Sequence, residues 1–163
     1  MNRSSRLLAA LTLIALPSVA GAQAITGSIV ATADISTVFS FGAPTGLSFG
    51  NITPGSAAIG SGYIPLSRNV GVIYSLPDGA TTGRLVGPGG NLQPTYTCGV
   101  GTTSATIVSP FSNCNAAGAQ LTLASPATML TEYVIFNGSL AAAQTNITPG
   151  TYTGTIRVTA TPN

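Results

Sequence analysis

The C-terminal part of the chain alternates between apolar and polar residues. Within residues 150–162, one set of alternate positions includes Tyr152, Ile156 and Val158, whereas the other set holds threonines and Arg157. Successive side chains of a strand point to opposite faces. The alternation therefore predicts one half-buried strand, with its apolar side chains in the core and its threonines outside.

A second alternating segment lies near the N-terminus. Its apolar parity contains Ile25, Ile29, Ala31, Ala33 and Ile35, and polar residues fill the other parity except at Val30. This segment is predicted to be a strand, and two interpretations remain open. It is either the first strand of its own sheet or a donor strand that pairs with an exposed sheet edge of another molecule.

Short β-branched and apolar runs, separated by turn residues, predict further strands. These runs occupy residues 47–49, 70–76, 94–98, 104–108, 120–123 and 130–136. Helical patterns are nearly absent, and only residues 140–144 are predicted to form a helical turn. About eight short strands are enough for two packed sheets, so the sequence predicts an all-β, antiparallel β-sandwich.

The pentapeptide Asn-Ile-Thr-Pro-Gly occurs twice, at residues 51–55 and 146–150. Proline presets φ and glycine supplies a positive φ, so each copy is predicted to form a type II turn. Repeat proteins repeat whole units of about 20 residues or more, so two such turns do not indicate a repeat architecture.

The N-terminus has the pattern of a secretory signal peptide. Arg3 and Arg6 precede an apolar run at residues 7–16, and Ala20-Gly21-Ala22 then predicts cleavage before Gln23. An alternative site lies two residues later. The apolar run is shorter than the ~20 residues that span a membrane.

This pattern predicts two parts, a signal peptide at residues 1–22 and one domain at residues 23–163. The mature protein is expected to be exported to the periplasm, the cell surface or the medium. No membrane insertion is expected after processing.

Charge is scarce in the predicted mature chain. Two of the five cationic residues lie in the signal peptide, so three arginines remain against three carboxylates, with no net charge. Binding to nucleic acid depends on neutralising many phosphates, and binding to anionic membranes depends on clustered cations. Both kinds of partner are therefore disfavoured.

Cys98 and Cys114 are the two cysteines of the chain. In an exported protein such a pair is predicted to form a disulfide, and two free thiols are the alternative. Two cysteines without any histidine make a poor zinc site, so no metal or other cofactor is expected.

The residues that most hydrolases need are missing. Without histidine and lysine, the chain offers no Ser-His, Cys-His or Ser-Lys arrangement. Its three carboxylates are far apart in the sequence, and Glu132 is expected on the exposed face of a strand. The sequence therefore predicts a protein that is not an enzyme. A hydrolase ranks third, after the two non-catalytic functions described below.

Three segments carry a resemblance to known proteins. Residues 47–55 resemble the "LSFG-x-I-x-PG" segment of small secreted bacterial β-domains, and residues 136–140 and 149–160 resemble their closing "GG-x-L … aGtYtGt-x-x-Vtv" pattern. That uncharacterised family is related to spore-coat-protein-U-like domains and to chaperone–usher pilins. The resemblance implies an immunoglobulin-like or jelly-roll sandwich.

The expected function follows from export, fold and resemblance together. The chain is predicted to be a structural or adhesive cell-surface subunit, similar to a pilus or coat component. Its expected partners are other copies or related subunits joined by strand addition, and a periplasmic chaperone. The alternative is a monomeric periplasmic or secreted module that binds a small ligand or a glycan.

Overall fold

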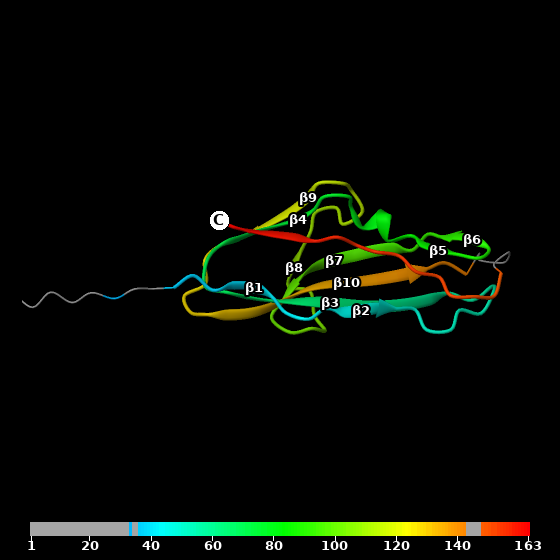
Figure 1. The fold of residues 1–163 in the computed structure, drawn as a ribbon, viewed down its shortest axis with the longest axis horizontal. Coiled ribbons are helices and arrows are strands. Elements are labelled where there is room, and N and C mark those ends of the chain that lie inside the picture. The colour runs from blue at the N-terminus through cyan, green and yellow to red at the C-terminus, as the bar shows by residue number, and fades with distance from the viewer. Residues whose placement is uncertain (1–32, 34–35, 143–147) are drawn as a thin grey trace, which may run out of the picture. The chain divides into compact units, whose positions relative to one another are not determined.

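Two antiparallel sheets pack against each other in the computed structural model, which describes Ala33, residues 36–142 and residues 148–163 (Figure 1). The predicted all-β sandwich is thereby confirmed. The described sheets belong to one unit, Ile35–Asn163. The predicted signal peptide and most of the predicted donor strand lie outside the described residues.

The larger sheet has six strands in the order β1-β3-β10-β7-β8, and β2 also pairs with β3. Their bounds are β1 Phe39–Phe41, β2 Thr45–Ser48, β3 Ala58–Arg68, β7 Thr95–Gly101, β8 Ser109–Pro110 and β10 Leu130–Leu140. The two long strands β3 and β10 pair over their full length. They form the frame on which the other strands of this sheet are placed.

The smaller sheet has three strands in the order β11-β4-β9. Its strands are β4 Val72–Leu76, β9 Ala119–Leu123 and β11 Thr159–Pro162. A 3-10 turn, η1 Ala80–Gly83, follows β4 and leads to a separate hairpin of β5 Leu85–Gly87 and β6 Gly90–Leu92. Figure 1 shows β4, β9 and the red C-terminal segment above the layer of β3, β7 and β10.

The core lies between the sheets and comes from alternate positions of their strands. Leu66, Val72, Leu76 and Val134 have no exposed surface, and Tyr74 from β4 is also fully buried among them. Burying such side chains stabilises the fold by about 1.5–3 kcal/mol each relative to leaving them in water.

The terminal strand is shorter than the alternation predicts. Only Thr159–Pro162 pairs regularly, with β4, and Thr153 forms a single bridge with Val86. The predicted faces are confirmed for Ile156 and Val158, which pack on the core, and for the threonines, which are exposed. Tyr152 was also predicted to point into the core, but it packs on Gly87 of β5 instead. Alternation sets which side of the chain is buried, but a ladder also needs a neighbouring strand at the right distance.

Strand β3 was not predicted, because two glycines and a proline interrupt its pattern. Gly62 faces the segment of β2, where a Cβ atom would lie 2.8 Å from the Thr45 carbonyl oxygen. Glycine therefore allows β2 to approach closely, and this packing reason outweighs its poor strand propensity.

Most of the other predicted strands occur where the sequence places them, but at least one end of each differs from the prediction. The predicted strand at 104–108 is wrong, because residues 102–105 form bends and β8 begins only at Ser109. Leu140 ends β10 rather than starting a helical turn, and residues 143–144 lie outside the described residues. Strands β1, β5 and β6 were also missed, and each is only three residues long.

Candidate functional site

A buried ion pair links β3 and β10 within the larger sheet, and it overturns the expected exposure of Glu132. The Arg68 guanidinium donates from Nε to Glu132 Oε1 at 2.6 Å and from Nη2 to Oε2 at 3.1 Å. Tyr74 of the opposite sheet donates its hydroxyl to Glu132 Oε1 at 2.5 Å. Arg68 and Glu132 are each 3% exposed. The prediction that Glu132 lies on the exposed face of its strand is therefore wrong.

The remaining donors of this guanidinium are also used. Arg68 Nη1 donates to the carbonyl oxygens of Val70, at 2.6 Å, and Ala124, at 2.8 Å. Burial, followed by the hydrogen bond to Glu132, raises the pKa of Tyr74 above its usual range. The three side chains satisfy one another and present no group to solvent, so the cluster has a structural role.

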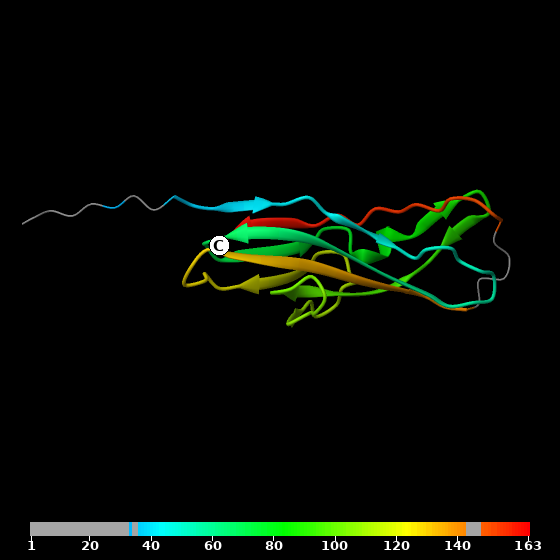
Figure 2. The same ribbon diagram turned by 90° about the horizontal axis from the view of Figure 1, so that it is seen from below.

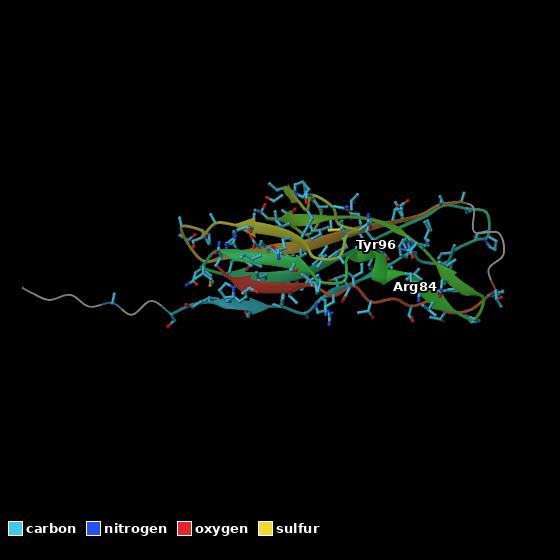
Figure 3. The ribbon with its side chains drawn as sticks, turned by 90° about the horizontal axis from the view of Figure 1, so that it is seen from above. Arg84 and Tyr96 are labelled. Atoms are coloured by element: carbon cyan, nitrogen blue, oxygen red, sulfur yellow. A yellow bond between two sulfur atoms is a disulfide. The ribbon has the colours of Figure 1, made fainter. Side chains whose placement is uncertain are left out.

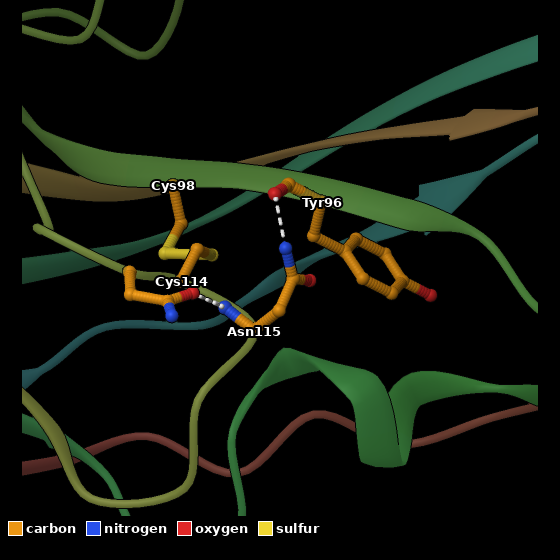
Figure 4. The surroundings of a disulfide bond; sticks show 5 residues. Tyr96, Cys98, Cys114 and Asn115 are labelled. Carbon is orange, nitrogen blue, oxygen red and sulfur yellow. Dashed lines mark hydrogen bonds between the residues drawn. A yellow bond between two sulfur atoms is a disulfide. The ribbon is translucent and has the colours of Figure 1, made fainter.

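One flank of the sandwich is closed by the disulfide. Cys98 of β7 bonds to Cys114 in the loop before β9, with Cα atoms 5.6 Å apart, as the sequence predicts (Figure 4). Beside it, Asn115 Nδ2 donates to the Tyr96 carbonyl oxygen at 3.2 Å. The Ala80 amide donates to the Cys114 carbonyl oxygen at 2.9 Å. These contacts tie the larger sheet to the loop and to η1.

Tyr96 extends this connection across the core. Its hydroxyl donates to the Gly83 carbonyl oxygen at 2.5 Å, next to Arg84 (Figure 3). Burial raises the pKa of Tyr96 to about 12.

The opposite flank is open between β2 and the C-terminal segment. A cavity of about 280 Å³ lies between Thr45–Leu47 on one side and Gly154–Ile156 on the other. Apolar side chains from the sandwich interior reach this cavity, namely Leu47, Ile64, Leu85, Tyr96, Phe136 and Ile156.

A second cavity, of about 530 Å³, shares Leu47 and Leu85 with the first. It lies between residues 47–54 and 148–152, with Leu92 as a further contact. The first copy of the repeated pentapeptide and the described part of the second copy thus line one cavity. We call the two cavities together the edge groove, and Figure 2 shows the cyan and red-orange segments that border it.

The edge groove combines unpaired backbone with an uncharged lining. Within the described residues, Gly154–Val158 makes no hydrogen bond to another main chain, and β2 pairs with β3 alone. The residues that line both cavities include no Asp, Glu, Lys or Arg. An extended, apolar segment would find here both main-chain partners and a surface to cover.

The C-terminal wall of the groove is held in place from behind. Tyr152 packs so closely on Gly87 that a Cβ atom there would lie 2.5 Å from its ring. Thr153 and Val86 exchange two main-chain hydrogen bonds of 2.8 and 3.1 Å. This wall is therefore fixed to β5, and its other side faces the groove.

The predicted donor residues Ile25, Ile29, Ala31 and Ile35 lie outside the described residues, and Ala33 belongs to no described strand or helix. Both pentapeptides were predicted to be turns, but their sequence did not predict that they line the same cavity. Their identical sequence was the available signal, although it does not indicate proximity in space.

Among the described residues, no three His, Cys, Asp or Glu side chains come together as metal ligands. No described helix has the length and hydrophobicity needed to cross a membrane.

The disulfide is the feature of this structure that bears on cellular location, because disulfides are typical of oxidising compartments outside the cytoplasm. Comparison with protein-family models gave no match. The search of curated proteins and the search of solved structures gave none either. The fold and the edge groove are therefore the basis for any functional conclusion.

Proposed function

We propose that the protein is an exported, non-catalytic subunit of a cell-surface structure, joined to its neighbours by strand addition. The edge groove is the acceptor, and residues 25–35 of another copy or of a related subunit are the donor. The observation that carries this proposal is the open flank between β2 and the C-terminal segment, where main chain is unpaired.

The donor segment suits the groove in pattern and charge. Ile25, Ile29 and Ile35 share one parity, so an extended chain turns them towards one face. The groove offers apolar side chains from Leu47, Phe136 and neighbouring residues to that face. Asp34, the one charged residue of the segment, falls on the other parity and would face solvent.

Main-chain pairing supplies affinity in strand addition, whereas alternate side chains supply specificity. In this arrangement the added strand lies between β2 and Gly154–Val158 and closes the open flank. On the other flank the disulfide ties β7 to the loop before β9, so the flank between β2 and Gly154–Val158 is the one that the added strand would cover. An edge of this kind also suits a periplasmic chaperone, which would cover the groove before assembly.

Export is part of the same proposal and is supported by the signal-peptide pattern of residues 1–22 together with the disulfide. N-terminal sequencing of protein secreted into the periplasm or medium is expected to begin at Gln23 or Ile25. A mature chain that retains Met1 would contradict it.

Strand addition is tested by separating donor and acceptor. Protein from which residues 23–35 are deleted is mixed with a synthetic peptide of residues 23–36, and binding is measured by calorimetry. We expect saturable binding of the peptide and a rise in the melting temperature of the protein. The intact mature chain is expected to form oligomers in sedimentation analysis.

The control uses the alternation of the peptide. Ile29→Asp places a charge on the face that enters the groove and is expected to abolish binding, whereas Ser28→Asp, on the other face, is expected to preserve it. An intact chain that stays monomeric, together with a peptide that does not bind, would refute the proposal. Monomers whose stability depends on residues 23–35 would instead show that this segment completes its own sheet.

A further inference from the structure

The outer face of the larger sheet carries a field of uncharged polar side chains away from the edge groove. Five exposed polar residues and the exposed Ile59 form this surface, which we call the Asn137 face: Ile59, Ser61, Thr95, Thr97, Asn137 and Ser139. A trough of about 590 Å³ lies over these residues.

The strand register places these side chains in two rows. Asn137 lies between Ser61 and Thr97, and Ser139 lies between Ile59 and Thr95. Neighbouring strands are about 4.8 Å apart and alternate residues about 6.8 Å along a strand, so the polar groups form a regular array. Ser48 of β2 extends the first row because it pairs with Ser61.

Most of the hydrogen-bonding capacity of this array is unused. Thr95 donates its hydroxyl to the Ser139 carbonyl oxygen at 3.3 Å. The side chains of Ser61, Thr97 and Asn137 make no hydrogen bond to any residue of the described part of the chain. Their hydroxyl and amide groups both donate and accept, so they remain available to a ligand of the same kind.

The chain itself covers the apolar half of the same sheet face. Ile135 is 1% exposed although its parity is that of Asn137, and Ile107 packs against Gly99 beside it. Tyr63 and Tyr133 meet edge to face, with ring centroids 5.4 Å apart, at the border of the open half. The open half is therefore the polar half, bounded by partly exposed aromatic rings.

No charge lies on the Asn137 face. Arg68 and Glu132, the charged residues of β3 and β10, are buried on the other side of the sheet. A highly charged ligand would lose water from its charges on binding and would find no counter-ion here in return. A neutral ligand rich in hydroxyl groups has no charge to desolvate. We infer that this face binds a neutral polysaccharide, whose sugar hydroxyls hydrogen-bond to the array and whose apolar ring faces contact Ile59 and Tyr63.

This inference does not depend on strand addition, because none of the six residues of the Asn137 face lines the edge groove, although Ser48 and Tyr96 border both the groove and the trough. Within the proposed assembly, each subunit would add one such face, and repeated weak sites raise the overall affinity for a polymer. Either property can fail in experiment without the other.

The test is affinity electrophoresis of the mature chain in native gels that contain a neutral polymer. Laminarin, hydroxyethyl cellulose and galactomannan serve as neutral probes, and polygalacturonate and chondroitin sulfate serve as charged ones. We expect retardation by at least one neutral probe and none by the charged probes.

Paired variants then locate the binding surface. Thr97→Ala with Asn137→Ala is expected to weaken the retardation about tenfold, because two hydrogen-bonding groups are removed. Gln120→Ala with Thr122→Ala makes the same kind of change on the exposed side of β9 and is expected to have no effect. Asn137→Asp keeps the side-chain size and is expected to weaken binding without unfolding the protein.

Three results would overturn the inference. The first is that none of the neutral probes retards the protein. The second is that the charged probes retard it as strongly as the neutral ones. The third is that Thr97→Ala with Asn137→Ala abolishes self-association while glycan retardation is unchanged, which would assign this face to contact between copies.

Discussion

Removing one partner of the buried ion pair is expected to destabilise the protein strongly. Glu132→Gln keeps the shape of the side chain but leaves the Arg68 guanidinium without a counter-charge in a site that is 3% exposed. The neighbouring carbonyl oxygens of Val70 and Ala124 accept hydrogen bonds but do not neutralise the charge. Tyr74 also loses its charged acceptor.

The expected loss is about 3–5 kcal/mol in the free energy of unfolding, which is typical when a buried pair loses one member. Exchanging all three side chains, as Arg68→Met with Glu132→Leu and Tyr74→Phe, removes the two charges and the buried hydroxyl together. That triple variant is expected to recover much of the loss, because apolar packing replaces a costly desolvated pair and no hydroxyl is left without an acceptor.

The control is the exposed pair of Asp78 and Arg157, whose side chains are 43% and 63% exposed at an N–O distance of 2.7 Å. Asp78→Asn is expected to change stability by less than ~1 kcal/mol. Urea unfolding followed by circular dichroism measures all the variants. If Glu132→Gln costs no more than Asp78→Asn, the guanidinium is not desolvated and the reasoning is wrong.

Three further predictions test the fold. Replacing Cys98 and Cys114 by serine is expected to cost ~2–4 kcal/mol in unfolding free energy, and mass analysis without reductant checks their bond. Ile156→Ala is expected to cost about 2 kcal/mol because Ile156 packs on the core, whereas Thr155→Ala should stay within ~0.5 kcal/mol. Equal losses in denaturant melts would contradict the assigned faces. The raised pKa of Tyr96, about 12, predicts that stability falls as the pH rises above ~10, the value of an unfolded tyrosine. Urea melts from pH 8 to 12 are expected to show a smaller decline for Tyr96→Phe, and an unchanged decline would exclude this cause.

Turn and strand chemistry is local, and here the sequence was a partial guide. In the first pentapeptide the Ser56 amide donates to the Thr53 carbonyl oxygen at 3.0 Å and Gly55 has a φ of 82°, as a type II turn requires, whereas Gly150 in the second has a φ of 154°. The apolar parity of Ile156 and Val158 is the buried side in the structure, because side-chain direction follows from strand geometry alone. The disulfide was also predicted, since the composition offers a single pair of cysteines.

Contacts between residues far apart in the chain could not be predicted from local sequence patterns. Nothing in the alternation around Glu132 indicates that Arg68 and Tyr74 lie beside it, because three strands from two sheets meet there. Strand β3 was missed for a related reason. Its glycines weaken the local signal, and their benefit appears only where β2 packs against them.

The sequence by itself therefore determined an all-β chain, its disulfide, its scarcity of charge and the faces of its last strand, since each depends on composition or on the two-residue period of a strand. The tertiary structure decided which strands are neighbours, how the chain buries its ion pair and where it leaves main chain unpaired. It also brought residues 51–54 and 148–150 to one groove. Those features depend on contacts between residues far apart in the chain, and sheet order and register are set by packing of the whole domain rather than by local propensity.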